Sequence, residues 1–270
     1  MKNYRTVLDL PKKPEFPKNS PEVVRVLDSI RKTFDDDEHG EFYWFAREYP
    51  RFYRYHLNHA EYRIKLIYGR YENFHSAVIQ KVKNEKVNEH SVGFGESADF
   101  AYQTYWDFEA YLSAINTAID LLARIVGTAY QEQLPPSFNK ICRKEELGGA
   151  ILILREAKKS WISRLKDYRD CFVHYTPVDN LVFMEARLYS AGWEIRCKLP
   201  TNPNTRDIMR FRFSRRNELL RYSLSVWRRM QKLDKDIALY ISNEFKAGRY
   251  PQKIHGLFST GTRAYPEIAT

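Results

Sequence analysis

The residues best suited to carry chemistry lie in the segment 167–175, Asp-Tyr-Arg-Asp-Cys-Phe-Val-His-Tyr. Within it, Arg169, Asp170 and His174 supply a guanidinium, a carboxylate and an imidazole. RNA cleavage can use such a set: a base takes the proton of the ribose 2′-hydroxyl, an acid protonates the leaving 5′-oxygen, and a cation stabilises the charge on the phosphate. Arginine suits the last role because its planar fork matches phosphate oxygens. The segment is therefore a candidate catalytic site that needs no metal.

A long helix is expected to position this segment. The sequence from about Gly149 to Tyr175 follows the helical period, and Pro177 prevents the helix from continuing. Large apolar side chains form one narrow stripe along it, which predicts the buried side of the helix: Trp161, Leu165, Tyr168, Phe172 and Tyr175.

The polar residues of the segment fall on the opposite side of this helix. Asp167, Asp170 and His174 all project away from the stripe, and Arg169 flanks them with a side chain long enough to reach the same face. Because Asp170 and His174 are four residues apart, the carboxylate can hydrogen-bond the ring and fix its tautomer. The nearby helix C-terminus favours a protonated imidazole. A solvated face of an ordinary amphipathic helix would show the same residue types, so a structural interpretation stays open.

The spacing of these residues resembles a known motif. Four residues separate Arg169 from His174, and a polar residue follows the arginine. The pattern resembles the R-x4-6-H motif of the HEPN superfamily, whose arginine is usually followed by Asn, Asp or His. The resemblance covers about residues 97–245, and the chain looks most like bacterial HEPN proteins with an N-terminal helical extension and a β-hairpin insertion. It implies a mainly α fold, an antiparallel helical bundle with a small β-hairpin insertion.

The resemblance also implies a function. HEPN nucleases are metal-independent endoribonucleases that leave a 2′,3′-cyclic phosphate, so Arg169 would stabilise the phosphate, His174 would be the acid and base, and Asp170 would orient it. One histidine cannot readily fill both proton-transfer roles, and HEPN nucleases dimerise, which implies a homodimer acting on RNA without a cofactor. Such proteins are commonly toxins or phage-defence effectors, with an antitoxin or nucleotidyltransferase partner. The alternatives are a non-catalytic HEPN module that binds nucleotide, RNA or a partner protein, and a purely structural helical protein.

A second basic segment follows the predicted hairpin. Arg210, Arg212, Arg215 and Arg216 lie in a stretch interleaved with aromatic residues and could hold an RNA backbone while the rings stack on bases. A solvated strand face explains Arg210 and Arg212 equally well. The aromatic residues nearby are Phe211, Phe213, Tyr222 and Trp227, and the helical phase of Trp227 predicts that it belongs to the core.

The composition limits the class of protein. The 270 residues carry a net charge of +10, which favours anionic partners such as nucleic acid. The three cysteines, Cys142, Cys171 and Cys197, are scattered without a CxxC pair, which argues against a disulfide framework and a zinc ribbon. The N-terminus lacks the apolar region of a secretory signal, and no uncharged apolar run approaches about 18 residues. We therefore expect a cytoplasmic protein that does not bind membranes.

The rest of the sequence predicts three parts. Residues 1–95 form an arm and a helical extension, in which Ser20 caps a first helix and Pro50 divides residues 41–89 into two helices. Residues 96–246 form the HEPN-like domain, with helices at about 97–126 and 216–245 and a β insertion at about 181–213. Residues 247–270 form an irregular tail. Residues 90–96 are expected to be a linker.

Two groups of residues have types that bind metals. Residues 35–38 are a run of four acids, and His56 and His59 share one face of a helix. Neither group has a convincing set of further ligands, so we expect a solvated turn and a polar helix face instead of a metal site.

Overall fold

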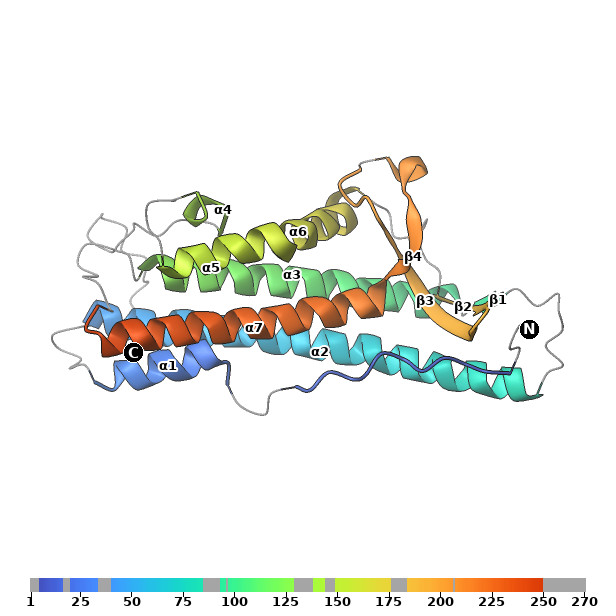
Figure 1. The fold of residues 1–270 in the computed structure, drawn as a ribbon, viewed down its shortest axis with the longest axis horizontal. Helices are drawn as coiled ribbons and strands as arrows, with labels where there is room; N and C mark the ends of the chain where they lie inside the picture. The colour runs from blue at the N-terminus through green and yellow to red at the C-terminus, as the bar shows by residue number, and fades with distance from the viewer. Residues whose placement is uncertain are drawn as a thin grey trace, which may run out of the picture. The chain divides into compact units, whose positions relative to one another are not determined.

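The computed structural model describes residues 5–16, 20–33, 40–84, 93–95, 97–128, 138–143, 149–175, 184–205 and 207–249. They are mainly helical with a small antiparallel sheet, as the sequence predicts (Figure 1). The acidic run at 35–38, Pro177 and the tail from residue 250 lie outside the described residues.

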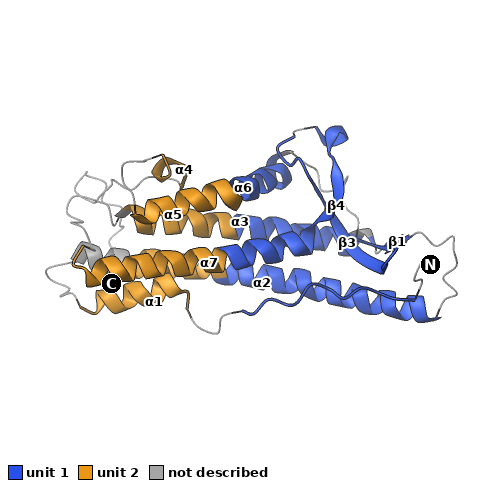
Figure 2. Ribbon diagram, viewed as in Figure 1, with its two compact units in different colours: residues 1–16, 58–114, 163–229 blue, residues 17–57, 115–162, 230–270 orange. Residues whose placement is uncertain are grey.

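The chain divides into two compact units (Figure 2). Unit 1 comprises residues 1–16, 58–114 and 163–229, and unit 2 comprises residues 17–57, 115–162 and 230–270. The unit boundaries cut through long helices and differ from the boundaries that we expect at residues 95 and 246. The catalytic candidates and the second basic segment all belong to unit 1.

Three long helices and one composite helix make up most of the structure. The long helices are α2 (Gly40–Asn84), α3 (Ala98–Thr128) and α7 (Leu219–Lys246). The composite helix consists of α5 (Gly149–Ala157), a π-helical turn η2 (Lys158–Ile162), α6 (Ser163–Asp170) and a second π-helical turn η3 (Cys171–Tyr175). The short helices are α1 (Glu22–Arg31) and α4 (Phe138–Ile141). Within unit 1, the successive helices α2, α3, α6 and α7 run in alternating directions (Figure 2).

Buried polar contacts connect the helices of unit 1. Asp107 of α3 accepts hydrogen bonds from Arg63 of α2, at 2.8 Å, and from Arg70. The Tyr111 hydroxyl of α3 donates to the Ser223 carbonyl of α7 at 2.9 Å. Buried polar groups cost free energy unless they are paired. These contacts therefore favour the arrangement of the helices in which each buried polar group meets its partner.

The predicted β-hairpin is confirmed, and the sheet is larger than expected. Strands β2 (Met184–Tyr189) and β3 (Gly192–Pro200) pair antiparallel across the turn. On one side, β1 (Gly93–Gly95) pairs with β2 within the segment that we expected to be a linker. On the other, β3 pairs with β4 (Phe213–Glu218). The alternation at 208–213 suggests one more strand, but Ile208–Arg210 are a 3₁₀ turn, η5, and the strand begins only at Phe213.

The N-terminal arm extends along unit 1 and contacts the sheet. Backbone hydrogen bonds join Leu8 N to the Trp193 carbonyl, at 2.8 Å, and Trp193 N to the Thr6 carbonyl, at 2.9 Å. Gly192 has φ +133°, and a Cβ there would lie 2.5 Å from the Thr6 carbonyl oxygen. Glycine is therefore required at this turn for both its backbone angle and the close approach of the arm.

The cap of α1 differs from the prediction. The N-cap position is Pro21, without a side-chain cap, and the expected capping by Ser20 is wrong. The first amides of α1 donate instead to the carboxylate of Asp234 in α7: Glu22 N at 2.6 Å and Val23 N at 3.4 Å. Asp234 also accepts from the Tyr53 hydroxyl at 3.0 Å. A carboxylate at a helix N-terminus satisfies its orphan N–H groups and interacts favourably with the helix dipole.

Burial of Asp234 predicts a dependence of stability on pH. Burial raises the pKa of Asp234 to about 6, although its three hydrogen-bond donors oppose the shift. Between about pH 4 and pH 6, Asp234 is therefore protonated in the folded chain but ionised in the unfolded chain. The stability that this group contributes is lost as pH rises through that window. We expect the free energy of unfolding of the wild type, relative to Asp234→Asn, to fall from pH 4 to pH 6 in denaturant titrations. Parallel pH profiles for the two proteins would contradict this assignment.

Pro50 does not divide α2 as predicted. The helix is continuous from Gly40 to Asn84, with the proline inside it. An internal proline costs about 3 kcal/mol because it removes one backbone hydrogen bond and crowds the preceding turn. Tyr49, Tyr53 and Leu57 are buried on either side of it, and burial of such side chains stabilises a helix by about 1.5–3 kcal/mol each. Packing therefore outweighs the local penalty.

One described helix segment, Asp99–Gly127, is long and apolar enough by composition to cross a membrane. Its most apolar window is 67% buried inside the protein, which is the usual arrangement for a core helix of a soluble protein.

Candidate functional site

The predicted buried stripe holds the candidate site in place. Tyr168 and Phe172 are buried, as are Trp161, Leu165 and Cys171. The Phe172 ring stacks on Tyr105, with centroids 6.0 Å apart, and meets Phe108 edge-on at 5.4 Å. The stripe is confirmed for these residues; the side chain of Tyr175 lies outside the described ones. The aromatic contacts fix which side of α6 and η3 faces the core.

The three candidate residues lie at the surface on the opposite side. His174 is exposed, and the Arg169 and Asp170 side chains are 32% and 46% exposed. The Arg169 Nη1 atom lies 3.4 Å from Asp170 Oδ1, so the guanidinium and the carboxylate form an ion pair. The hydrogen bond that we expect between Asp170 and His174 stays a prediction. All three groups are open to a ligand from solvent.

A π-helical turn lies inside the motif. Arg169 and His174 are five positions apart, which on an α-helix places them about 140° apart around the axis. The turn η3 covers residues 171–175, and a π-turn bonds residue i to residue i+5, which brings residues five apart towards the same side. The wider turn therefore lessens the angle between the guanidinium and the imidazole. Single π-turns inside α-helices occur frequently at functional sites.

The same face carries two further charged side chains. Burial, and then the charge of Asp170, raise the pKa of Asp167, while Arg164 opposes the shift. Arg164 Nη2 donates to the Tyr168 hydroxyl at 3.3 Å. The sequence analysis placed Asp167 on this face but missed Arg164, although its spacing of four residues from Tyr168 indicates the contact.

Within unit 1, the strand that carries the second basic segment is bonded to the buried side of the helix that carries the motif. Asn217 of β4 donates through Nδ2 to the Tyr168 hydroxyl at 2.6 Å, and Tyr168 donates to the Pro200 carbonyl at 2.6 Å. Arg169 directly follows Tyr168 in the chain, and Arg216 directly precedes Asn217. The strand that carries the arginines is thus attached directly to the helix that carries the motif.

The four arginines of this segment differ in their surroundings. Arg210 pairs with Asp207 at 3.1 Å. Arg215 pairs with buried Glu194 at 2.7 Å and lies over the Tyr189 ring, so it stabilises the sheet. Arg212 and Arg216 are exposed, and neither side chain forms an ion pair with another residue in the described parts of the chain. These two are the arginines best placed for a phosphate backbone.

The neighbouring aromatic residues mostly belong to the core. Trp227 is buried, as its helical phase predicts, and Tyr222 packs edge-on against Tyr168 with centroids 4.7 Å apart. Phe213 is 43% exposed, so it is the member of the group most accessible to a base. Of the predicted site in which aromatic rings between the arginines stack on bases, only the region around Phe213 therefore remains a good candidate.

Metal and disulfide chemistry find no support in the described residues. No group of three or more His, Cys, Asp or Glu side chains in these ranges could hold a metal ion. His59 accepts a hydrogen bond from Arg63 at 3.1 Å, and Cys142, Cys171 and Cys197 are buried free thiols.

No protein-family model, no curated protein and no solved structure matches this chain.

Proposed function

We propose that this chain is a metal-independent endoribonuclease of the HEPN type, located in the cytoplasm. The proposal is supported by one observation above all: the ion-paired Arg169 and Asp170 are partly exposed and His174 is exposed near the end of a helix whose other side is buried, with a π-turn inside the motif. The resemblance to the R-x4-6-H motif adds the reaction type and the biological setting, a toxin or phage-defence effector.

The proposed reaction is an internal transesterification. A neutral imidazole takes the proton of the ribose 2′-hydroxyl, whose oxygen then attacks the adjacent phosphorus and displaces the 5′-oxygen. A protonated imidazole gives its proton to that leaving oxygen, so the products are a 2′,3′-cyclic phosphate and a 5′-hydroxyl. Arg169 stabilises the charge on the phosphate, and Asp170 orients His174. Two imidazoles are needed, and a second copy of the chain supplies the other His174.

The exposed arginines of β4 extend the proposed RNA site. Because Tyr168 and Asn217 join α6 to β4, an RNA strand at Arg169 can continue towards Arg216 and Arg212. Each phosphate contact contributes sequence-independent affinity that weakens as salt rises.

We expect the purified protein to cut RNA equally well with and without EDTA, because the proposed groups are all side chains. The test incubates it with single-stranded RNA and identifies the product ends by mass. Arg169→Ala/His174→Ala should remove the activity, and Arg228→Ala, which alters an exposed arginine of α7 outside the site, should keep it.

Three results would overturn the proposal: cleavage that needs Mg²⁺ or Mn²⁺, activity that persists in the double variant, and product ends other than the cyclic phosphate. Light scattering tests the dimer separately. A protein that is monomeric at the concentration where it cuts RNA would contradict the two-histidine site.

A non-catalytic HEPN module is the second candidate function. The exposed Arg212 and Arg216 favour it, since binding to RNA, a nucleotide or an acidic partner protein needs basic side chains without an acid and base. RNA that is bound but never cut, with equal affinity for the Arg169→Ala/His174→Ala variant, would establish this alternative. A nucleotidyltransferase antitoxin is the protein partner that the resemblance implies.

A further inference from the structure

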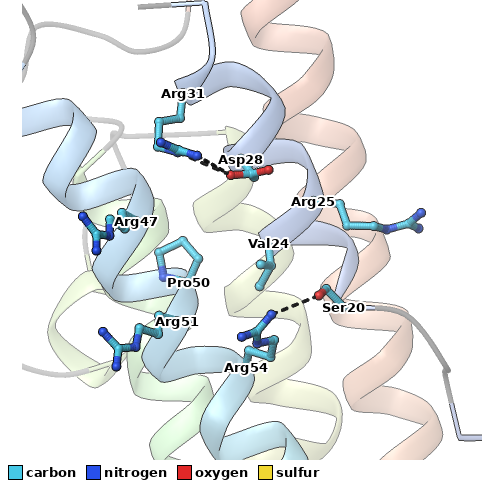
Figure 3. Close-up of a pocket in the computed structure, with 9 residues that line it drawn as sticks. All are labelled: Ser20, Val24, Arg25, Asp28, Arg31, Arg47, Pro50, Arg51 and Arg54. Carbon is cyan, nitrogen blue, oxygen red and sulfur yellow. Dashed lines mark hydrogen bonds and ion pairs between the residues drawn. The ribbon is translucent and has the colours of Figure 1, made fainter. Parts of the chain in front are cut away.

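A cavity in unit 2 is lined by arginines from two helices. It lies between α1 and the first half of α2 and has a volume of about 600 Å³ (Figure 3). Arg25 and Arg31 come from α1, and Arg47, Arg51 and Arg54 come from α2. None of the residues of the proposed ribonuclease site is among those that line this cavity.

The spacing of the arginines explains why they gather there. Positions 47, 51 and 54 are four and three residues apart, so they form one row along a face of α2. Figure 3 shows the three side chains on α2: Arg54 extends towards Ser20 and α1, whereas Arg47 and Arg51 extend to the other side. Five cations that repel one another around one cavity are costly to hold together unless an anion is present, since like charges at such spacing destabilise a helix.

Carboxylates nearby compensate the arginines only in part. Asp28 accepts from Arg31 Nη2 at 2.9 Å and pairs with Lys32 at 3.3 Å. Glu22 pairs with Arg25, and Glu48 lies 3.4 Å from Arg47 and 3.8 Å from Arg51. Among the described residues, five basic side chains thus share three carboxylates. Each pair joins near neighbours in sequence and has at least one exposed partner, so it contributes little and exchanges readily for a better partner.

Arg54 is the least compensated of the five. Its Nη1 atom lies 3.4 Å from the Ser20 hydroxyl, and the structure gives its guanidinium no ion pair within the described ranges. The first amides of α1 are already occupied by Asp234, so the helix N-terminus does not supply the site. The capacity to bind an anion rests on the side chains, with Val24 and Pro50 as the apolar part of the wall.

We propose that this cavity binds a small ligand through a chain of phosphates, either an inorganic polyphosphate or the triphosphate of a nucleotide. Arginine forks bind phosphate oxygens in pairs, and several arginines at one cavity suit several phosphates better than one. The volume lies within the range of small-molecule sites, about 300–1,000 Å³. None of the described lining residues is aromatic, which disfavours single-stranded RNA, whose bases stack on aromatic rings.

Isothermal titration calorimetry of the full chain tests the proposal with tripolyphosphate, ATP, AMP and a short single-stranded RNA. The site variant is Arg51→Gln/Arg54→Gln, and the matched control is Arg228→Gln/Arg229→Gln, which removes two exposed arginines of α7 outside the cavity. We expect the site variant to weaken tripolyphosphate binding on the order of a hundredfold, from two lost charge-assisted contacts, and the control to bind as the wild type does.

The ligand series separates the two sources of phosphate. ATP that binds no more tightly than tripolyphosphate identifies the phosphate chain alone as the ligand; tighter binding of ATP identifies a nucleotide. Equal losses in the site variant and the control, or RNA that binds at this cavity more tightly than tripolyphosphate, would overturn the proposal.

Hydrogen exchange on the wild type provides a second test that needs no variant. Tripolyphosphate should slow amide exchange in residues 20–31 and 47–54, and protection confined to residues 207–221 would overturn the cavity assignment. Neither measurement involves RNA cleavage, so this proposal and the ribonuclease proposal can fail independently.

Discussion

His174→Ala is expected to reduce RNA cleavage by about 10²–10⁴-fold, and by more if the same group serves both proton transfers, while the protein stays folded. The imidazole is the proposed acid and base, and no other histidine lies in the motif. His174 is exposed on the side opposite the buried stripe, and substitutions at such positions usually change stability by about 0.5 kcal/mol or less. Rates and melting temperatures should be measured on the same preparation.

Phe172→Ala is the matched control for this experiment. The residue lies two positions away but is buried against Tyr105 and Phe108. A large-to-small change there should lower the free energy of unfolding by about 3–5 kcal/mol, and activity should be lost only through unfolding. The two variants thus separate chemistry from packing within one turn of helix.

The outcomes of this pair are distinct. If His174→Ala melts as low as Phe172→Ala, the histidine is structural and the motif interpretation is wrong. If it folds normally and cuts RNA at the wild-type rate, the catalytic assignment is wrong and the binding module becomes the better proposal.

Glu218→Ala is expected to lower the free energy of unfolding by about 3–5 kcal/mol, because several buried donors lose their shared acceptor. The Glu218 carboxylate immediately precedes α7 and accepts from Leu220 N at 3.0 Å and Arg221 N at 2.9 Å, which caps that helix. It also accepts from the Tyr71 hydroxyl of α2 and from Cys197 N of β3 at 3.4 Å. One side chain thus joins two helices and the sheet.

Denaturant unfolding measures this effect. Glu218→Gln should cost less than Glu218→Ala, because its amide oxygen still accepts from some of the donors. Glu72→Ala is the control: Glu72 is half exposed and pairs with Lys13 at 3.5 Å, so its loss should cost less than about 1 kcal/mol. A loss for Glu218→Ala no larger than that of the control would show that the network contributes nothing measurable.

Periodicity predicted the long elements well. The helix expected at about 97–126 is α3, the one expected from 149 to 175 is the composite helix, and Trp227, which was predicted to belong to the core, is buried in α7. The β insertion expected at about 181–213 contains the hairpin of β2 and β3. Each of these depends on the side chains of one continuous segment. The exposure of His174 and the partial exposure of Arg169 and Asp170 followed from the same pattern.

Edges and caps were predicted less well. Phe211 and its neighbours alternate like a strand, yet Ile208–Arg210 form a 3₁₀ turn and β4 begins at Phe213. Glu194 and Arg196 occupy the polar positions of β3 but are buried, because Arg215 and the Ser214 carbonyl bind them from β4. Alternation identifies a strand but does not show whether its polar side is covered.

The sequence by itself determined where the long helices and the hairpin form and which of their faces are apolar. Only the tertiary structure decided what those faces meet: Asp234 caps α1 from 212 positions away, α2 continues through Pro50, and arginines of α1 and α2 line one cavity. The physical reason is the sequence separation over which each kind of interaction acts. Helical and strand periodicity express the local geometry of the backbone, whereas capping, burial of charge and convergence of side chains depend on partners that the chain brings together only when it packs.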